Sequence, residues 1–134
     1  MAETQSSIPM SAGGIPMKPG LVTAVAVMTL VNGILNLLWG LGVTASVVLG
    51  TLGLGLLCAP VTILPSILGI FEIIYGARLL AAAPIGTRPS RSLAILEICA
   101  IVAGNVISLV VGILVLVFYA DASVKDYFAR LNAT

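Results

Sequence analysis

The chain has 134 residues, of which 60% are hydrophobic and only 8% are charged, and its mean hydropathy is +1.21. A water-soluble domain of this size cannot bury so much apolar surface, because small domains leave much of their surface exposed. The net charge of +1 excludes a strongly basic surface for nucleic acid, and the absence of histidine excludes imidazole ligation of a metal or haem.

Residues 1–20 are rich in Ser, Gly, Pro and Met, which predicts a flexible N-terminal arm. From Pro19 to Phe71 no residue is charged, and this stretch is too long for one crossing, since a single helix needs about 20 apolar residues. The sequence therefore predicts an all-α integral membrane protein. Residues 21–120 are expected to form an antiparallel bundle of four transmembrane helices, at about residues 21–41, 44–58, 61–83 and 92–119.

The boundaries of these helices rest on glycine and proline. The glycines of Gly40–Gly42 favour a tight turn after the first helix, and Pro60 is expected to end the second. Polar residues 82–91 predict the turn before the last helix. Residues 44–60 are short and rich in glycine, so a re-entrant segment with three crossings is the alternative. The distribution of Lys and Arg does not decide between three and four crossings.

The C-terminal residues 121–134 carry an amphipathic pattern. Ser123 followed by Asp126 is typical of a helix start. An apolar stripe at helical spacing follows, formed by Val124, Tyr127, Phe128 and Leu131. The pattern predicts a short helix lying in the membrane interface, and the alternative is a frayed extension of the last transmembrane helix.

Small residues recur every fourth position in the last predicted helix, at Ala100, Gly104, Ser108 and Gly112. Small residues allow close approach of helices in lipid, where no hydrophobic force brings helices together. Facing grooves are expected from glycines on the first and third helices, including Gly33, Gly69 and Gly76. The pattern fits either packing within the chain or docking of a partner.

Charged residues within the bundle suggest one specific pair. Arg78 and Glu97 lie at equal distances in sequence from the centre of the turn between the last two predicted helices, which places them at equal depth. We therefore expect an ion pair between Arg78 and Glu97, since a lone charge at that depth is costly. The competing interpretation is that the Arg78 side chain reaches the interface alone.

Glu72 is expected to be the deepest charge in the chain, within reach of Asn105, Asn32 and Asn36. An intramembrane carboxyl group is a candidate for handling protons or cations or for binding a partner. The structural interpretation is a protonated glutamate that shares hydrogen bonds with the asparagines. Residues 68–73 and 93–98 are similar in sequence, but the expected difference in depth of their glutamates argues against a symmetric site.

Several segments resemble a group of small, uncharacterised multi-pass bacterial membrane proteins. They are Val22–Gly33, Leu68–Gly76, Arg91–Ile98, Gly104–Gly112 and Val124–Phe128. Similar proteins often carry Asp-Pro-Glu-Val-Lys where this chain has Asp-Ala-Ser-Val-Lys. The resemblance implies a bacterial inner membrane, but no activity and no functional residues.

The sequence contains no cluster of acids, bases or nucleophiles suited to catalysis, no metal motif and no nucleotide-binding pattern. The first expectation is therefore a non-catalytic membrane protein without a cofactor. Such a protein acts by helix association, as an accessory subunit of a larger membrane complex or as a homo-oligomer. The alternative is a small proton- or cation-linked transporter or channel that uses Glu72. The expected partners are the lipid bilayer and another membrane protein or a second copy.

Overall fold

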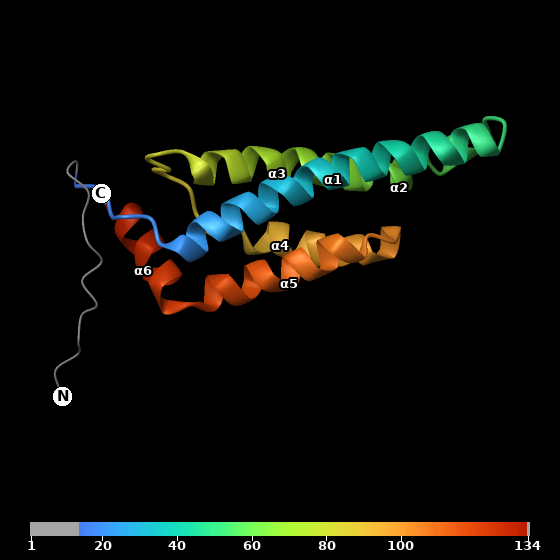
Figure 1. The fold of residues 1–134 in the computed structure, drawn as a ribbon. Coiled ribbons are helices and arrows are strands. Elements are labelled where there is room, and N and C mark those ends of the chain that lie inside the picture. Colours follow the sequence, from blue (N-terminus) through green and yellow to red (C-terminus); the bar gives the residue numbers. More distant parts are fainter. Residues whose placement is uncertain (1–13, 134) are drawn as a thin grey trace.

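The computed structural model describes residues 14–133, so most of the predicted arm, residues 1–13, lies outside the described residues, as does Thr134. Two antiparallel helix pairs, α1 with α3 and α4 with α5, lie side by side, and α6 crosses one end of the bundle (Figure 1). The elements are α1 (Gly20–Gly50), η1 (Leu54–Leu57), α2 (Ala59–Thr62), α3 (Leu64–Leu80), α4 (Arg91–Cys99), η2 (Ala100–Ala103), α5 (Val106–Ala120) and α6 (Ala122–Leu131).

The all-helical architecture agrees with the prediction, but the four crossings are not confirmed. In the part of the chain that the structure describes, two helical segments are long and apolar enough to cross a membrane, namely Gly20–Gly50 and Ala59–Leu80. A third crossing is counted only if α5 and α6, which meet at a bend of 74°, are treated as one span.

The first helix is longer than predicted, because α1 continues through Gly40–Gly42 and absorbs the first part of the predicted second span. Gly40 serves close packing rather than a turn. A Cβ atom on Gly40 would lie 2.6 Å from the backbone nitrogen of Ser66, and the Ser66 hydroxyl donates a hydrogen bond of 2.9 Å to the Leu37 carbonyl. The glycine therefore allows α3 to approach α1 closely.

The chain reverses after α1 at residues 51–53, where Gly53 adopts a left-handed conformation with φ of 95°. The Thr51 hydroxyl donates to the Val47 carbonyl and accepts from the Gly55 amide, which satisfies backbone groups in an apolar segment. Pro60 lies in the first turn of α2, where proline is tolerated, instead of ending a transmembrane helix.

The predicted last span is a hairpin of two helices rather than one helix. Gly104 has φ of 79°, a left-handed conformation that glycine adopts without strain, and the Asn105 side chain caps α5 by accepting from the Ser108 amide. The predicted groove of small residues is therefore not continuous. Ala100 lies in η2 and Gly104 in the turn, so only Ser108 and Gly112 remain on α5.

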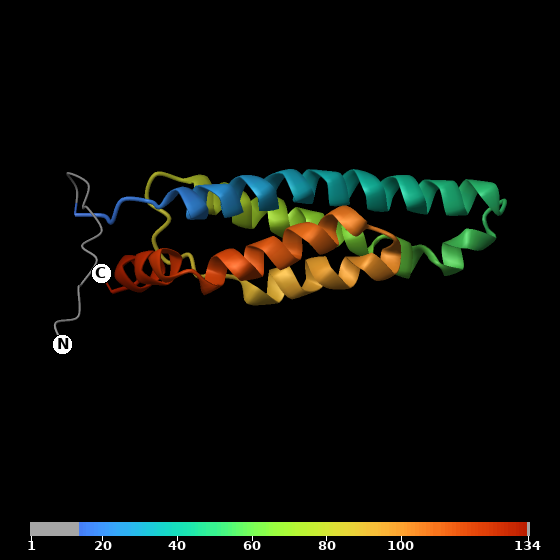
Figure 2. The same cartoon turned by 60° about the horizontal axis from the view of Figure 1, so that its bottom comes forward.

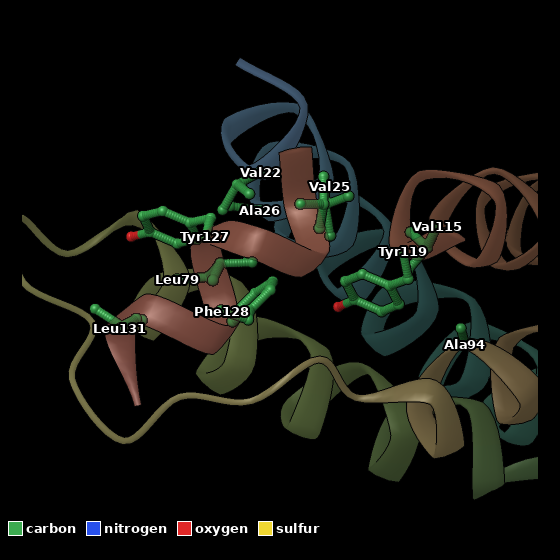
Figure 3. Close-up of a cluster of buried hydrophobic side chains, with 11 residues drawn as sticks. Val22, Val25, Ala26, Leu79, Ala94, Val115, Tyr119, Tyr127, Phe128 and Leu131 are labelled. Atoms are coloured by element: carbon green, nitrogen blue, oxygen red, sulfur yellow. The ribbon is translucent and has the colours of Figure 1, made fainter. Parts of the chain in front are cut away.

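The C-terminal helix α6 also differs from the prediction. Its apolar stripe is not exposed for contact with lipid, because Val124, Tyr127, Phe128 and Leu131 are buried within the protein. Figure 3 shows this stripe packed over the end of the bundle, where it meets residues from the other helices. Those residues are Val22, Val25, Ala26, Leu79, Ala94, Val115 and Tyr119. The apolar face of this amphipathic helix is therefore covered by the chain itself.

The basic residues gather at this end of the molecule. The start of α1, the end of α3, the start of α4 and α6 all lie there, whereas the turn after α1 lies at the opposite end (Figures 1 and 2). The six Lys and Arg residues lie in these helix ends or in the segments directly before them: Lys18, Arg78, Arg88, Arg91, Lys125 and Arg130. The turn after α1 forms the opposite end, and the turn between α4 and α5 points the same way but ends short of it (Figure 1). Neither turn carries a charge.

Candidate functional site

A buried carboxyl group lies between α1 and α3. Glu72 is 0% exposed, and the side-chain amides of Asn32 and Asn36 both donate to it. The Asn32 nitrogen is 3.2 Å from Glu72 Oε2, and the Asn36 nitrogen is 3.0 Å from Oε1 and 2.9 Å from Oε2. The two asparagines are one helical turn apart, so α1 presents both amides to the same carboxyl group.

The start of α5 completes this network through the side-chain oxygens of the same two asparagines. The Ser108 hydroxyl donates to the side-chain oxygens of Asn36 at 2.8 Å and Asn32 at 3.2 Å, and the Asn105 amide also donates to Asn36. Each asparagine of α1 therefore accepts from α5 through its oxygen and donates to Glu72 through its nitrogen. The break at Gly104 makes this arrangement possible, because it places the first turn of α5 against the middle of α1.

A second carboxyl group, that of Glu97 on α4, lies beside Glu72. Glu97 is 1% exposed, and its side chain lies close enough to that of Glu72 for the two carboxyl groups to interact directly. The Oε2 atom of Glu97 is buried without a hydrogen-bond partner among residues 14–133, as is the hydroxyl of Thr29 on α1. Unsatisfied buried atoms of this kind are uncommon in folded proteins.

Two carboxyl groups in contact in the buried interior cannot both be ionised without a large energetic cost. A hydrogen bond between them also requires one proton, since two carboxylates have no donor. Amide groups donate to Glu72, which favours its ionised form, so we infer that Glu97 carries the shared proton and donates it to Glu72. The site is therefore suited to binding and releasing a proton.

Glycine brings the helices that carry these carboxyl groups close to their partners. A Cβ atom on Gly33 would lie 2.7 Å from the Gly69 carbonyl oxygen and 2.8 Å from the Glu72 Cβ atom. A Cβ atom on Gly112 would lie 2.9 Å from the Glu97 Cβ atom. Gly76 approaches α1 in the same way, within 2.9 Å of the Ala26 carbonyl oxygen. The small residues therefore pack within the chain.

These matching contacts correspond to an internal repeat in the sequence. Residues 29–38 read TLVNGILNLL and residues 108–117 read SLVVGILVLV, with Leu, Val, Gly, Ile, Leu and Leu at shared positions. Residues 68–73 and 93–98 read LGIFEI and LAILEI. The first pair of segments lies on α1 and α5, and the second pair lies on α3 and α4.

The two helix pairs thus have equivalent contacts, with Gly33 against Glu72 in one and Gly112 against Glu97 in the other. The chain passes through them in opposite order, and α1 runs antiparallel to α5 (Figure 2). An operation that exchanges the pairs must therefore reverse the helix direction, and because it also reverses their order along the chain, it differs from the inverted-topology repeats of transporters. The expectation that the two glutamates are too far apart in depth for a common site is wrong.

The predicted ion pair between Arg78 and Glu97 is not formed. Glu97 faces Glu72 in the interior, whereas Arg78 is exposed at the basic end and lines a cavity there. The depth argument assumed one straight last helix beside α3, but Glu97 belongs to a hairpin whose buried face turns toward α1 and α3. Sequence reasoning missed Glu97 and Ser108 as members of the polar centre, although the repeat pairs both with α1–α3 residues.

Within the described part of the chain, no group of three or more His, Cys, Asp or Glu side chains is placed to hold a metal ion. Comparisons with protein-family profiles, curated protein sequences and solved structures gave no match to this chain. The functional argument therefore rests on the polar centre and on the arrangement of helices around it.

Proposed function

We propose that the chain is a multi-pass membrane protein in which α1 and the α2–α3 segment cross the bilayer and the α4–α5 hairpin is re-entrant. Several features support this topology. The turn of the hairpin exposes apolar Val102, which is 90% exposed, and Val106, which is 60% exposed. The indole nitrogen of Trp39 donates to the Ala103 carbonyl at 3.3 Å, so a backbone oxygen at the turn is satisfied without water.

The basic end is assigned to the cytoplasmic side of a bacterial inner membrane, because Lys and Arg near membrane segments favour the cytoplasm. This topology places all six basic residues on one side, whereas four straight crossings would have divided them equally between the two sides. Both the N-terminal end of α1 and α6 are then cytoplasmic.

We propose that the protein is a small proton-linked transporter or channel, and that the Glu72–Glu97 pair is its proton-binding site. The contact between these two buried carboxyl groups carries the proposal. Burying an ionisable group inside a membrane bundle costs free energy, so a group that is present there is a candidate for function.

Proton flux into liposomes that contain the purified protein tests this function. The acidification of a trapped pH-sensitive dye is followed under an imposed pH gradient, with valinomycin and potassium to balance charge. Wild-type protein is expected to dissipate the gradient, and Glu97→Gln is expected to abolish the flux while remaining folded. Absence of flux in the wild type, or equal flux in Glu97→Gln, would contradict transport of protons.

A second candidate function is association with another membrane protein or with a second copy. One observation favours it: an outward-facing apolar cavity of about 300 Å³ lies between α3 and the α4–η2 segment, lined by residues such as Leu64, Phe71 and Leu96. The small residues of the interior already pack against other helices of the same chain, so a partner would bind at this cavity instead. Cross-linking of Leu96→Cys in native membranes tests it, and only monomeric, unlinked protein would argue against association.

A further inference from the structure

A cavity of about 690 Å³ opens at the basic end, apart from the carboxyl pair. It is bounded by the end of α3, the connection over residues 81–90 and the start of α4. Arg78, Arg88 and Arg91 line it, one from each of these segments, and no Asp or Glu is among its lining residues. Three guanidinium groups around one cavity make a strongly positive site without a compensating acid.

The backbone of the cavity also favours an anion. Ser90, Arg91 and Ser92 line it at the start of α4, and no side chain among residues 14–133 caps this helix end. The N-terminus of a helix carries a partial positive charge and free N–H groups, which suit a phosphate oxygen. Guanidinium groups add paired donors in a planar arrangement that matches two phosphate oxygens.

The segment that carries Arg88 is held in place before any ligand binds. The Tyr75 hydroxyl donates to the Arg88 carbonyl at 3.0 Å and accepts from the Ser90 amide at 3.3 Å. The Tyr119 hydroxyl is 2.6 Å from that of Tyr75, which ties the connection to α5. Lys18 donates to the Leu79 carbonyl at 2.7 Å and fixes the end of α3. The three arginines are thus presented by an ordered frame.

We propose that this cavity binds the phosphate of an anionic phospholipid headgroup. The phosphate group is the chemistry that the arginines and the helix start recognise, and the lipid is the favoured source because apolar residues adjoin the cavity. Ile85 in its lining is 65% exposed, and Ile95 on the next turn of α4 is 52% exposed. These side chains would contact acyl chains while the headgroup occupies the basic cavity. This proposal does not depend on proton transport.

Lipid binding to the detergent-solubilised full chain, measured by native mass spectrometry, tests the proposal. Phosphatidylglycerol is expected to bind at least about tenfold more tightly than phosphatidylcholine, since charge-assisted contacts add to affinity. Arg88→Gln combined with Arg91→Gln should remove this preference. Lys125→Gln combined with Arg130→Gln removes two basic residues from α6 at the same end, outside the cavity lining, and should leave the preference unchanged.

Equal loss in both double variants would show that general attraction to the basic end explains the preference, which overturns the site. Equal binding of the two lipids by the wild type would also overturn it. A third arm uses inorganic phosphate without lipid. Inorganic phosphate alone could displace phosphatidylglycerol at low concentration and stabilise the wild type as much as phosphatidylglycerol does. In that case the site binds a soluble phosphate compound, and the lipid assignment is wrong. Thermal unfolding in phosphatidylcholine checks that all variants are folded.

Discussion

The carboxyl groups of Glu72 and Glu97 meet inside the bundle although they come from helices that run in opposite directions. Their surroundings differ in one important respect. Glu72 accepts hydrogen bonds from two asparagine amides, whereas Glu97 Oε2 has no donor among the described residues. The repeat that places the glutamates together is therefore asymmetric in its polar partners, because the asparagines of α1 correspond to valines on α5. This asymmetry separates the roles of the two carboxyl groups.

We predict that Glu97→Gln is tolerated and that Glu72→Gln destabilises the protein. A glutamine at position 97 can donate to Glu72, as the inferred protonated Glu97 does. A glutamine at position 72 has only one acceptor oxygen and presents its NH₂ group to the asparagine donors. The expected difference in the free energy of unfolding is about 1–3 kcal/mol, measured by thermal unfolding in mild detergent.

Asn105→Asp offers a check on this assignment, because it adds an acidic group to the same network through the amide that donates to Asn36. We expect it to lower stability as well. If Glu97→Gln proves more damaging than Glu72→Gln, then Glu97 is the ionised member of the pair and the inferred position of the proton is wrong.

Close packing at glycine predicts a second set of effects. Gly33→Ala should destabilise the protein by about 1–3 kcal/mol, because its new methyl group would overlap the Gly69 carbonyl and α3 would have to shift. Gly42→Ala, on the same helix, is the matched control, since nothing lies within 4 Å of the added atom. Thermal unfolding compares the two variants. Equal stability of both would show that α1 and α3 separate without cost.

Part of this architecture follows from sequence pattern alone. The four-residue spacing of Asn32 and Asn36 places both on one face of a helix, and the apolar stripe of α6 is visible as Val124 and its partners. Both patterns appear in the structure as contacts. The sequence of the stripe could not show whether it packs against protein or lipid, because the protein interior and the lipid acyl chains are equally apolar.

The hairpin turn was beyond sequence reasoning for a related reason. A glycine within an apolar stretch, such as Gly104, can allow close helix packing, and it can equally well adopt the left-handed conformation of a turn. The outcome depends on tertiary contacts: Asn105 and Ser108 must reach the asparagines of α1, and only a break at Gly104 aligns them. Misreading this turn also produced the expected ion pair of Arg78, because the depth of Glu97 was calculated along one straight helix.

The proposed re-entrant hairpin gives a topology that differs measurably from four crossings. In a variant without Cys58 and Cys99, which are exposed and unpaired, single cysteines are introduced at Thr87, Ala133 and Gly50. We expect a membrane-impermeant thiol reagent to label Thr87→Cys and Ala133→Cys from the same side and Gly50→Cys only from the other side. Four straight crossings would instead place residues 87 and 133 on opposite sides.

Docking of α6 gives a prediction about local stability. Phe128 is 4% exposed and packs edge-to-face on Tyr119, with ring centroids 6.3 Å apart. Phe128→Ala removes this contact and is expected to cost about 3 kcal/mol or more of local stability. Hydrogen–deuterium exchange of residues 122–131 should therefore accelerate. Lys125→Ala, on the exposed face of the same helix, should exchange at the wild-type rate.

The same helix should respond to acid through the residue that precedes it. Asp121 caps α6, and the Ser123 hydroxyl and amide both donate to its carboxylate, which lowers the pKa of Asp121 below its ordinary value. A lowered folded-state pKa means that the contribution is fully present above the ordinary carboxyl pKa and is lost as pH falls through the lowered value. Exchange in α6 should rise only in that acidic range. Asp121→Asn keeps a capping oxygen but cannot titrate, so its exchange should lack the acid-dependent rise. If both proteins respond to acid alike, then another group controls the docking of α6.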